Sequence, residues 1–404
     1  MKLHLPSGPL VGEIDLPISK SIANRYLIIS ALAENSPPEK EGLGEVNTPE
    51  DVRILQEALN SDSSEINIGM AGTAMRFLTA FYAVQEGKTV VLTGAERMKQ
   101  RPIAELVEAL RSVGADIDYL ENDGFPPLKV KGKKTSGGKV EISASVSSQF
   151  VSALMMIGPT MEHALQIHLT GKVLSKPYIE LTADCMRNSG AEVKLDGNSI
   201  FIQPSAYKST DVNIEADWTS ASYFYALAAT RPNSKLLLKD LNLNSSQGDS
   251  ILAEWFNEIG VVSKQKKNGV EITSSEVLDF PEELDFTNHP DLAQTFAFLT
   301  VTLSKPLRLV GLDNLRLKET DRVTALKTEL EKLCVSVSVE GNSMNISGAI
   351  SVKKVAVKTY NDHRMAMSAA VLSASIPVEI ETPDVVAKSF PGFWSAFKFS
   401  LQGT

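Results

Sequence analysis

A repeated segment constrains the fold of this chain more than any other feature. Six stretches share a short polar or glycine-containing loop followed by an apolar helical run with many small residues. The junctions between loop and helix recur roughly every 70 residues after a shorter first step, near Ser21, Thr73, Ser148, Ser220, Leu292 and His363. A second set of helices has matching spacing, with markers at Asp51, Ile103, Tyr178, Ser250, Asp321 and Phe393. The two sets together predict six units, each with two helices and several strands.

The ends of the second-set helices support these units. Gly114, Gly190 and Gly260 each stand between the last apolar turn and an alternating run, where a left-handed residue is expected. Cys334 occupies the equivalent position of the fifth unit, so we interpret this cysteine as structural. Runs such as KTVVLTG, LQIHLTG, KLLLKDL and PLRLVGL are typical of strands. Because 404 residues are too many for one ordinary core, the simplest arrangement is an α/β protein with three units in each of two domains.

Charge and cysteine content narrow the class of protein. The net charge of −9 argues against nucleic acid as the main partner. The two cysteines lie outside any CxxC or His-rich tract, so a disulfide framework or a structural zinc site is not expected. No apolar run is long enough for a signal peptide or a membrane helix. We therefore expect a cytoplasmic globular protein.

The first repeated helix begins with basic residues, which are unfavourable there without a ligand. Lys20 and Ser21 open the helix and Arg25 follows one turn later, although positive charge in the first turn opposes the helix dipole. The apolar stripe of this helix contains Ile22, Tyr26, Ile29 and Ala33. We expect Ser21 and Arg25 to lie off that stripe. A bound anion at the helix start would remove the conflict, and the alternative is a solvated basic face.

Other helix starts also carry charged or hydrogen-bonding side chains. In the first set these are Gly72, Thr73, Arg76, Ser147, Ser148, Gln149, Asp291, Asp362, His363 and Arg364. In the second set they are Arg101, Lys318, Glu319, Arg322 and Lys388. We expect Pro102 to be the first residue of its helix, and we expect the group from Lys318 to Arg322 to share one helical turn. Each group alone is compatible with a cap or a surface salt bridge. Their recurrence at corresponding ends of repeated units predicts one site for two small phosphate- and carboxylate-bearing molecules.

Ten motifs occur in the order found in one enzyme family. They are LPISKSIANR, GMAGTAMR, RMKQRP, SVSSQF, SKPY, ADWTSASYF, PDLAQT, DNLRLKETDR, YNDHRMAM and AKSFPGF. On these motifs the whole chain resembles the 5-enolpyruvylshikimate-3-phosphate synthase family. The resemblance implies a two-domain α/β enolpyruvyl transferase fold. Each domain would be an inside-out α/β barrel of three βαβαββ units, with the active site in the interdomain cleft. Residues 1–18 and 216–404 would form a domain closed by the N-terminal strand, mainly on the phosphoenolpyruvate side. Residues 19–215 would form the domain mainly on the shikimate 3-phosphate side.

The resemblance also implies the reaction and its residues. The family transfers the enolpyruvyl group of phosphoenolpyruvate to the 5-hydroxyl of shikimate 3-phosphate and releases phosphate. It implies a monomer without metal, organic cofactor, nucleic acid or membrane partner. Shikimate 3-phosphate would be held by Lys20, Ser21, Arg25, Ser147, Ser148, Gln149, Ser175, Tyr178, Asp291, Asn314 and Lys318. Phosphoenolpyruvate would be held by Lys20, Gly72, Thr73, Arg101, Gln149, Arg322, Arg364 and Lys388. Asp291 would take the hydroxyl proton, and Glu319 with Lys20 would deliver a proton to the enol carbon.

Two residues depart from the family pattern. Met70 stands where Asn is common in the sequence GNAGTAMR, and Phe77 follows Arg76 where Pro is usual. We expect that activity is retained, with altered affinity for phosphoenolpyruvate and an altered response to glyphosate-type inhibitors.

Two alternative functions remain open from the sequence. The enolpyruvyl transferase that acts on UDP-N-acetylglucosamine shares the fold. That family has a reactive cysteine in a glycine-rich loop and a Lys-Asn pair near the start, where this chain has Lys20 and Ser21. The second alternative is a catalytically silent homologue that binds small anions. The presence of four residues argues against it, namely Lys20, Asp291, Glu319 and Arg364.

Overall fold

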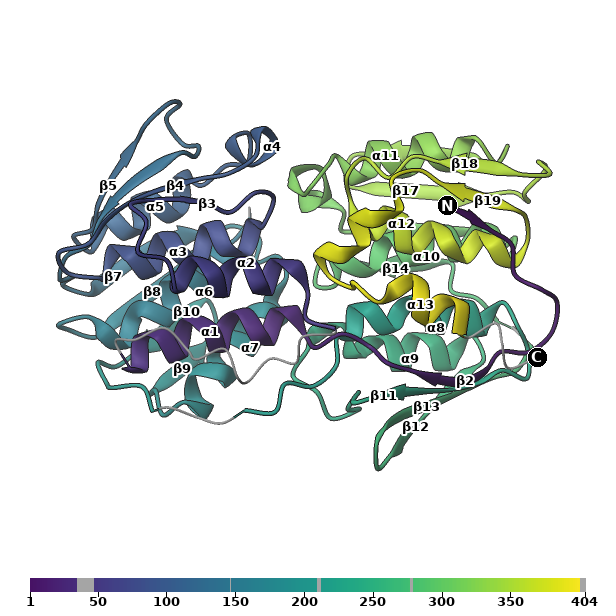
Figure 1. The fold of residues 1–404 in the computed structure, drawn as a ribbon, viewed down its shortest axis with the longest axis horizontal. Coiled ribbons are helices and arrows are strands. Elements are labelled where there is room, and N and C mark those ends of the chain that lie inside the picture. Colours follow the sequence, from purple (N-terminus) through teal and green to yellow (C-terminus); the bar gives the residue numbers. More distant parts are fainter. Residues whose placement is uncertain (35–46, 146, 209–211, 277–278, 400–404) are drawn as a thin grey trace. The chain divides into compact units, whose positions relative to one another are not determined.

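The chain divides into two compact units. The computed structural model describes residues 1–34, 47–145, 147–208, 212–276 and 279–399. Unit 1 comprises Met1–Ser19, Gly44–Glu50 and Glu215–Thr404, and unit 2 comprises Lys20–Leu43 and Asp51–Ile214. Figure 1 labels many of the helices and strands of each unit.

Unit 2 contains two four-stranded sheets of one topology. The first sheet has the order β3 (Glu65–Asn67), β4 (Thr89–Thr93), β6 (Leu128–Lys131) and β5 (Asp116–Tyr119). The second has the order β7 (Gly138–Ser143), β8 (Leu165–Thr170), β10 (Ser199–Ile202) and β9 (Val193–Asp196). In each sheet the first two strands are parallel with a helical crossover, and the last two form an antiparallel hairpin. Each sheet with its helices is therefore a βαβαββ unit.

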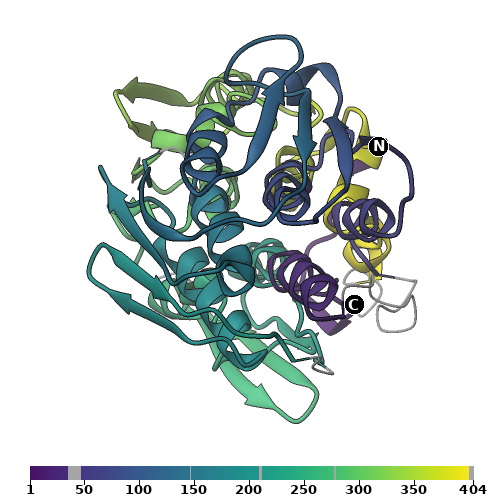
Figure 2. The ribbon, with the colours of Figure 1, turned by 90° about the vertical axis from the view of Figure 1, so that its left-hand side faces the viewer.

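The helices of unit 2 form its centre. They are α1 (Lys20–Glu34), α2 (Glu50–Leu59), α3 (Gly72–Ala83), α4 (Glu96–Lys99), α5 (Ala104–Ser112), α6 (Ser148–Ile157), the 3₁₀ turn η2 (Gly158–Thr160) and α7 (Lys176–Asn188). Helices α1, α3 and α6 pack against one another. Figure 2, in which the purple α1 is seen nearly end-on, shows strands of this unit on the outer side of its helices. Nearly every residue of α3 and α6 is buried, which explains why their sequences are apolar on all faces.

Unit 1 contains the same topology twice, together with a three-stranded sheet. One sheet has the order β12 (Val261–Lys266), β13 (Gly269–Ser274), β11 (Lys235–Lys239) and β2 (Val11–Ile14). Another has the order β14 (Glu283–Asp285), β15 (Leu307–Val310), β17 (Ser343–Ser347) and β16 (Ser336–Glu340). The third consists of β1 (Lys2–Leu3), β19 (Val378–Ile380) and β18 (Val355–Val357). The N-terminal residues thus pair with segments far along the chain, β2 with β11 and β1 with β19.

The helices of unit 1 pack in the same way. They are α8 (Trp218–Ala229), η3 (Gly248–Ile251), α9 (Leu252–Glu258), η4 (Pro290–Leu292), α10 (Ala293–Thr302), η5 (Asp313–Leu317), α11 (Arg322–Glu331), α12 (His363–Ala369), η6 (Ala370–Ala374), η7 (Pro383–Lys388) and α13 (Phe393–Phe399). Helix α10 contacts both α8 and α12. Every residue of α8 is buried, so it belongs to the core of this unit.

The predicted α/β fold of repeated units is confirmed, but the described residues show two four-stranded βαβαββ sheets in each unit and a three-stranded sheet in unit 1, where three βαβαββ units in each domain were expected. The first-set helices begin within two residues of the predicted junctions. Gly114, Gly190 and Gly260 are left-handed, with φ of 101°, 87° and 89°, and Cys334 has a φ of 62° at the equivalent position. In the described parts of the chain the strands form five separate sheets and not one closed barrel. Within the same ranges, no helix combines the length and hydropathy that a membrane span requires.

Candidate active site

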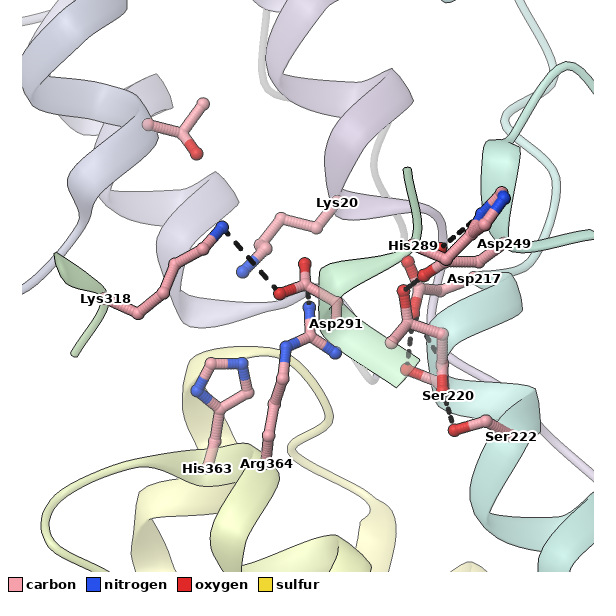
Figure 3. Close-up of polar contacts among 12 residues, drawn as sticks. Lys20, Asp217, Ser220, Ser222, Asp249, His289, Asp291, Lys318, His363 and Arg364 are labelled. Atoms are coloured by element: carbon pink, nitrogen blue, oxygen red, sulfur yellow. Dashed lines mark hydrogen bonds and ion pairs between the residues drawn. The ribbon is translucent and has the colours of Figure 1, made fainter. Parts of the chain in front are cut away.

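Seven charged residues of unit 1 form one connected group, which we call the Arg322 cluster. Its members are Lys318, Arg322, Arg364, Lys388, Asp291, Glu319 and Asp362. Asp291 accepts hydrogen bonds from Arg322 Nη1 at 2.9 Å and from Arg364 Nη2 at 2.8 Å. The Lys318 ammonium lies 3.9 Å from Asp291 Oδ1, and Figure 3 shows Lys318 and Arg364 both directed toward this carboxylate. Residues from the starts of η4, α11 and α12 therefore meet at Asp291.

Arg322 joins all three carboxylates of this cluster. Its Nε donates to Asp362 Oδ2 at 2.7 Å, and its Nη2 donates to Glu319 Oε2 at 2.9 Å. The other oxygen of Glu319 accepts from Lys388 Nζ at 2.7 Å. The Arg322 side chain is only 1% exposed. A buried position with acceptors on several sides suits arginine, because its rigid guanidinium presents five N–H donors in a plane.

The charges of the Arg322 cluster keep Asp291 ionised. Burial alone would raise the pKa of Asp291, but Arg364, Lys318 and Arg322 outweigh burial and hold that pKa well below its ordinary value. The cluster brings four basic side chains to one place. Basic side chains gathered in this way are suited to bind a phosphate or carboxylate anion.

Lys318 and Arg322 do not share one helical turn, contrary to the prediction. Helix α11 begins at Arg322, and Asp321 caps it by accepting from the Thr324 N–H at 3.1 Å. Lys318 has extended backbone with φ −81° and ψ −155°, directly after η5, which contains the buried Asn314. The predicted pair of Glu319 and Arg322 is confirmed at 2.9 Å. Both basic residues reach Asp291 because of the loop conformation and not because of i, i+4 spacing.

Asp362 has a structural role that sequence reasoning missed. It caps α12 by accepting from the Arg364 N–H at 2.9 Å, and the same carboxylate binds Arg322. Asp362 is fully buried and His363 nearly so. The available signal was an N-cap residue directly before two basic residues. The first turn of α12 is therefore tied to the first residue of α11.

In unit 2 Arg25 is buried, although we expected it to lie off the apolar stripe. Its Nε donates to Thr182 Oγ1 at 2.7 Å, and its Nη2 donates to Ser152 Oγ at 3.1 Å and to the Tyr178 carbonyl at 2.9 Å. Its Nη1 donates to the Ser21 carbonyl at 2.7 Å. The prediction was wrong because hydroxyl groups on α6 and α7 supply acceptors that an analysis of one helix does not reveal. Arg25 is thereby held in one orientation.

Phe77, one of the two departures from the family pattern, lies beneath Arg25. The Arg25 Cζ is 5.7 Å from the centroid of the Phe77 ring, and Phe77 is buried in α3. A guanidinium over an aromatic face is a stabilising cation–π arrangement. Met70, the other departure, is half-buried in the loop before α3. Phe77 therefore acts on Arg25.

Gly72 and Arg101 lie in direct contact. A Cβ atom at Gly72 would lie 2.8 Å from the Arg101 Cζ, which is too close for a real side chain. Glycine at this position therefore allows the guanidinium of Arg101 to lie against the start of α3. Arg76 donates to the Pro102 carbonyl at 2.9 Å and ties this loop to the same helix. Pro102 is not the first helical residue as predicted, because α5 begins at Ala104 with Ile103 as its N-cap.

The start of α6 is joined to the start of α3. Gln149 Nε2 donates to Thr73 Oγ1 at 3.0 Å. Ser147 is the N-cap of α6 and accepts from the Gln149 N–H at 3.2 Å, and Ser148 is buried beside it. Ser175 is the N-cap of α7 in a left-handed conformation, with φ 57°. The structure thus brings Gln149 and Thr73 together.

Lys20 has a partner that sequence reasoning missed. Its ammonium donates to Asp51 Oδ2 at 3.1 Å, and Asp51 is buried in the first turn of α2. Asp51 marked the second-set helix in the sequence, but its distance along the chain gave no indication of this pairing. The carboxylate supplies a counter-charge for Lys20 at the start of α1.

Comparisons with known proteins agree over nearly the whole chain. The family model EPSP synthase (3-phosphoshikimate 1-carboxyvinyltransferase) matches residues 38–397. A protein of Bacteroides fragilis named 3-phosphoshikimate 1-carboxyvinyltransferase is 41% identical over 399 residues, covering 97% of this chain and 96% of that protein. A protein of the same name from Haemophilus influenzae is 36% identical, with 97% of each chain covered. The solved EPSP synthase of Acinetobacter baumannii has the same fold, with a TM-score of 0.78 at 20% identity, covering 99% of this chain and 98% of that one. On this evidence the chain belongs to the EPSP synthase family of 3-phosphoshikimate 1-carboxyvinyltransferases.

Proposed function

We propose that this chain transfers the enolpyruvyl group of phosphoenolpyruvate to the 5-hydroxyl of shikimate 3-phosphate, with release of phosphate, by means of Asp291, Glu319 and Lys20. The reaction type follows from membership of the family. The observation that carries the residue roles is the Arg322 cluster, in which Asp291 and Glu319 share one buried arginine. Two carboxylates held by a common cation can divide two proton transfers between them.

The proposed phosphoenolpyruvate site consists of basic and small residues at helix starts. It contains Lys20, Gly72, Thr73, Arg101, Gln149, Arg322, Arg364 and Lys388. Supporting observations are the basic side chains that meet in the Arg322 cluster and the close approach of Arg101 to Gly72. Arginine forks suit the carboxylate and phosphate of this substrate, and they stabilise charge that develops in the intermediate.

The proposed shikimate 3-phosphate site uses mainly hydroxyl and amide groups. It contains Lys20, Ser21, Arg25, Ser147, Ser148, Gln149, Ser175, Tyr178, Asp291, Asn314 and Lys318. Arg25 supports this assignment because Thr182, Ser152 and Phe77 fix its guanidinium before any ligand binds. Residues held in one orientation beforehand lose less entropy on binding.

Asp291 would remove the proton of the 5-hydroxyl while the hydroxyl oxygen attacks C2 of phosphoenolpyruvate. Without a ligand Asp291 is a weak base, because the surrounding cations hold its pKa well below the ordinary value. Phosphoenolpyruvate is an anion and would compete for Arg364 and Arg322, so its binding raises the pKa of Asp291 toward a useful range. Substrate binding would thus activate the base.

Glu319 would deliver a proton to the methylene carbon of phosphoenolpyruvate, together with Lys20. This converts C3 to a methyl group and leaves C2 tetrahedral, bonded to the shikimate oxygen and to phosphate. Loss of phosphate and return of one methyl proton then form the enol ether of the product. Lys388 donates a hydrogen bond to Glu319, and this contact offers a route by which Glu319 can exchange its proton with Lys388.

Asp291→Asn and Glu319→Gln test these roles with little change in shape. We expect wild-type protein to release phosphate only when both substrates are present. Each variant should lower kcat by about 10²–10⁴, the usual contribution of general acid–base catalysis. Asp321→Asn is a matched control, because Asp321 caps α11 two residues from Glu319 and Asn caps a helix equally well. Wild-type kcat in Asp291→Asn or Glu319→Gln would exclude that residue from proton transfer.

The domain roles, oligomeric state and location are part of the proposal. Residues 1–18 and 216–404 would serve mainly phosphoenolpyruvate, and residues 19–215 mainly shikimate 3-phosphate. Lys20, Gly72, Thr73 and Arg101 are proposed exceptions in unit 2 that bind phosphoenolpyruvate. We propose a cytoplasmic monomer, and the two free cysteines support the location in a reducing compartment. Sedimentation velocity of the purified protein tests the monomeric state.

A further inference from the structure

Two consecutive residues adopt the left-handed backbone conformation directly before Asp362. Tyr360 has a φ of 55° and Asn361 a φ of 56°. Asn tolerates this region because its short polar side chain can bond locally, whereas Tyr has no such compensation. A strained conformation of this kind persists only where surrounding contacts determine it. The turn at Tyr360 and Asn361 therefore requires support from its neighbours.

Glu329 of α11 provides this support. The Tyr360 hydroxyl donates to Glu329 Oε1 at 2.7 Å, and the Lys358 backbone N–H donates to Glu329 Oε2 at 3.1 Å. The Glu329 side chain is fully buried, and Lys332 Nζ donates to it at 2.6 Å. Burial and the hydrogen bond to Glu329 raise the pKa of Tyr360 to about 12, so the hydroxyl stays protonated and remains a donor. The carboxylate thus binds the chain on both sides of Thr359.

The same helix also holds the residue that follows the turn. Arg322 lies about two helical turns before Glu329, and its Nε binds Asp362 at 2.7 Å. Asp362 in turn accepts from the Arg364 N–H. Helix α11 therefore contacts the chain before and after the strained turn. The conformation of the turn decides where Asp362 and the start of α12 lie relative to Arg322.

We propose that Glu329 and Tyr360 are positioning residues for phosphoenolpyruvate, because they fix the left-handed turn and thereby hold Arg322 and Arg364 in the geometry that binds this substrate. The inference rests on the proposed function, in which both arginines bind phosphoenolpyruvate. Removal of the Tyr360 hydroxyl leaves every member of the Arg322 cluster in the chain. Any effect of this removal on the binding of phosphoenolpyruvate must therefore be transmitted through the backbone of the turn.

Tyr360→Phe tests the proposal because it removes one hydroxyl and keeps the ring. We expect KM for phosphoenolpyruvate to rise between about 2-fold and 10-fold, the range of one net hydrogen bond, while KM for shikimate 3-phosphate stays at the wild-type value. Tyr225→Phe is the matched control, since the buried Tyr225 hydroxyl in α8 bonds to Ser263 Oγ at 2.7 Å in the same unit. The control should lower the thermal midpoint comparably and leave both KM values unchanged.

The possible results distinguish failure of the positioning role from failure of the proposed function. An unchanged KM for phosphoenolpyruvate in Tyr360→Phe, or a change equal to that in Tyr225→Phe, overturns the positioning role. If Tyr360→Phe does not fold, Glu329→Gln is judged by the same criterion, because its amide has one acceptor oxygen and cannot accept from both the Tyr360 hydroxyl and the Lys358 N–H. If the wild type releases no phosphate, the proposed function fails instead. In that case the positioning role is tested by the rise in thermal midpoint that inorganic phosphate causes. A smaller rise in Tyr360→Phe than in the wild type supports positioning, and an equal rise overturns it.

Discussion

Replacement of Arg322 by lysine keeps the charge at the centre of the cluster but removes the planar fork. Arg322 donates four hydrogen bonds, two to Asp362 and one each to Asp291 and Glu319. A lysine ammonium carries its three donors on one nitrogen and cannot span carboxylates that bind different edges of a guanidinium. We expect at least two of the four charge-assisted hydrogen bonds to be lost.

The lost hydrogen bonds correspond to a decrease in the free energy of unfolding. Each hydrogen bond to a charged group contributes about 1.5–3 kcal/mol. Water cannot readily replace the lost donors, because the side chains of Asp362 and Glu319 are only 0% and 10% exposed. Two lost bonds predict a decrease of about 3–6 kcal/mol in the free energy of unfolding, close to the cost of a broken buried ion pair. For a domain of 150–250 residues this is a decrease in Tm of roughly 6–24 °C.

Thermal unfolding followed by circular dichroism measures this decrease. Arg316→Lys is the matched control, because Arg316 pairs with Asp321 at 3.0 Å but is 42% exposed. Its substitution should change the free energy of unfolding by no more than about 0.5 kcal/mol. The Arg322→Lys variant should also raise KM for phosphoenolpyruvate. A Tm within about 2 °C of the wild-type value, together with an unchanged KM, would show that the planar guanidinium of Arg322 is not needed to hold the three carboxylates.

Three further substitutions test other contacts. Gly72→Ala places a Cβ against Arg101, 2.8 Å from its Cζ, so steady-state kinetics should show KM for phosphoenolpyruvate raised by about tenfold or more; an unchanged KM means that Arg101 moves away at no cost. Phe77→Leu keeps apolar volume but removes the ring beneath Arg25, and calorimetry should show shikimate 3-phosphate bound about 2–5-fold more weakly; equal affinity excludes a role for the ring. Asp291 has a depressed folded-state pKa, so its contribution to stability is complete above the unfolded-state pKa of about 3.9 and declines as the pH falls toward the lower folded-state pKa. Acid unfolding of Asp291→Asn should therefore be less steep below about pH 4, and identical curves contradict the assignment.

The repeat could be predicted from the sequence because helices buried on all sides carry a strong and regular signal. Helices such as α8 and α6 are apolar on every face and begin at capped polar loops, so spacing alone located them. The left-handed C′ residues were also predictable, since glycine follows three of the second-set helices, at Gly114, Gly190 and Gly260. The pairing of β1 with β19 was not readable from spacing, because two short strands at opposite ends of the chain contain no local signal of their partner.

The candidate site was predictable in composition but not in geometry. Arg25 was expected outside the apolar stripe, but Thr182 and Ser152 on other helices provide buried acceptors for it. Lys318 was expected in the first turn of α11, although Asp321 three residues before Thr324 is a cap signal that marks a later start. The first error arose because a single helix was considered without its neighbours, and the second because the cap at Asp321 was not used to place the helix start. Tertiary contacts, which determine the site, follow from the packing of several units.

The most direct measurement is phosphate release from phosphoenolpyruvate by the wild-type protein, with either shikimate 3-phosphate or UDP-N-acetylglucosamine as the acceptor. We predict release with shikimate 3-phosphate and none with UDP-N-acetylglucosamine, and we predict that Asp291→Asn removes most of it. Release with UDP-N-acetylglucosamine alone, or with neither acceptor, would contradict the proposed function.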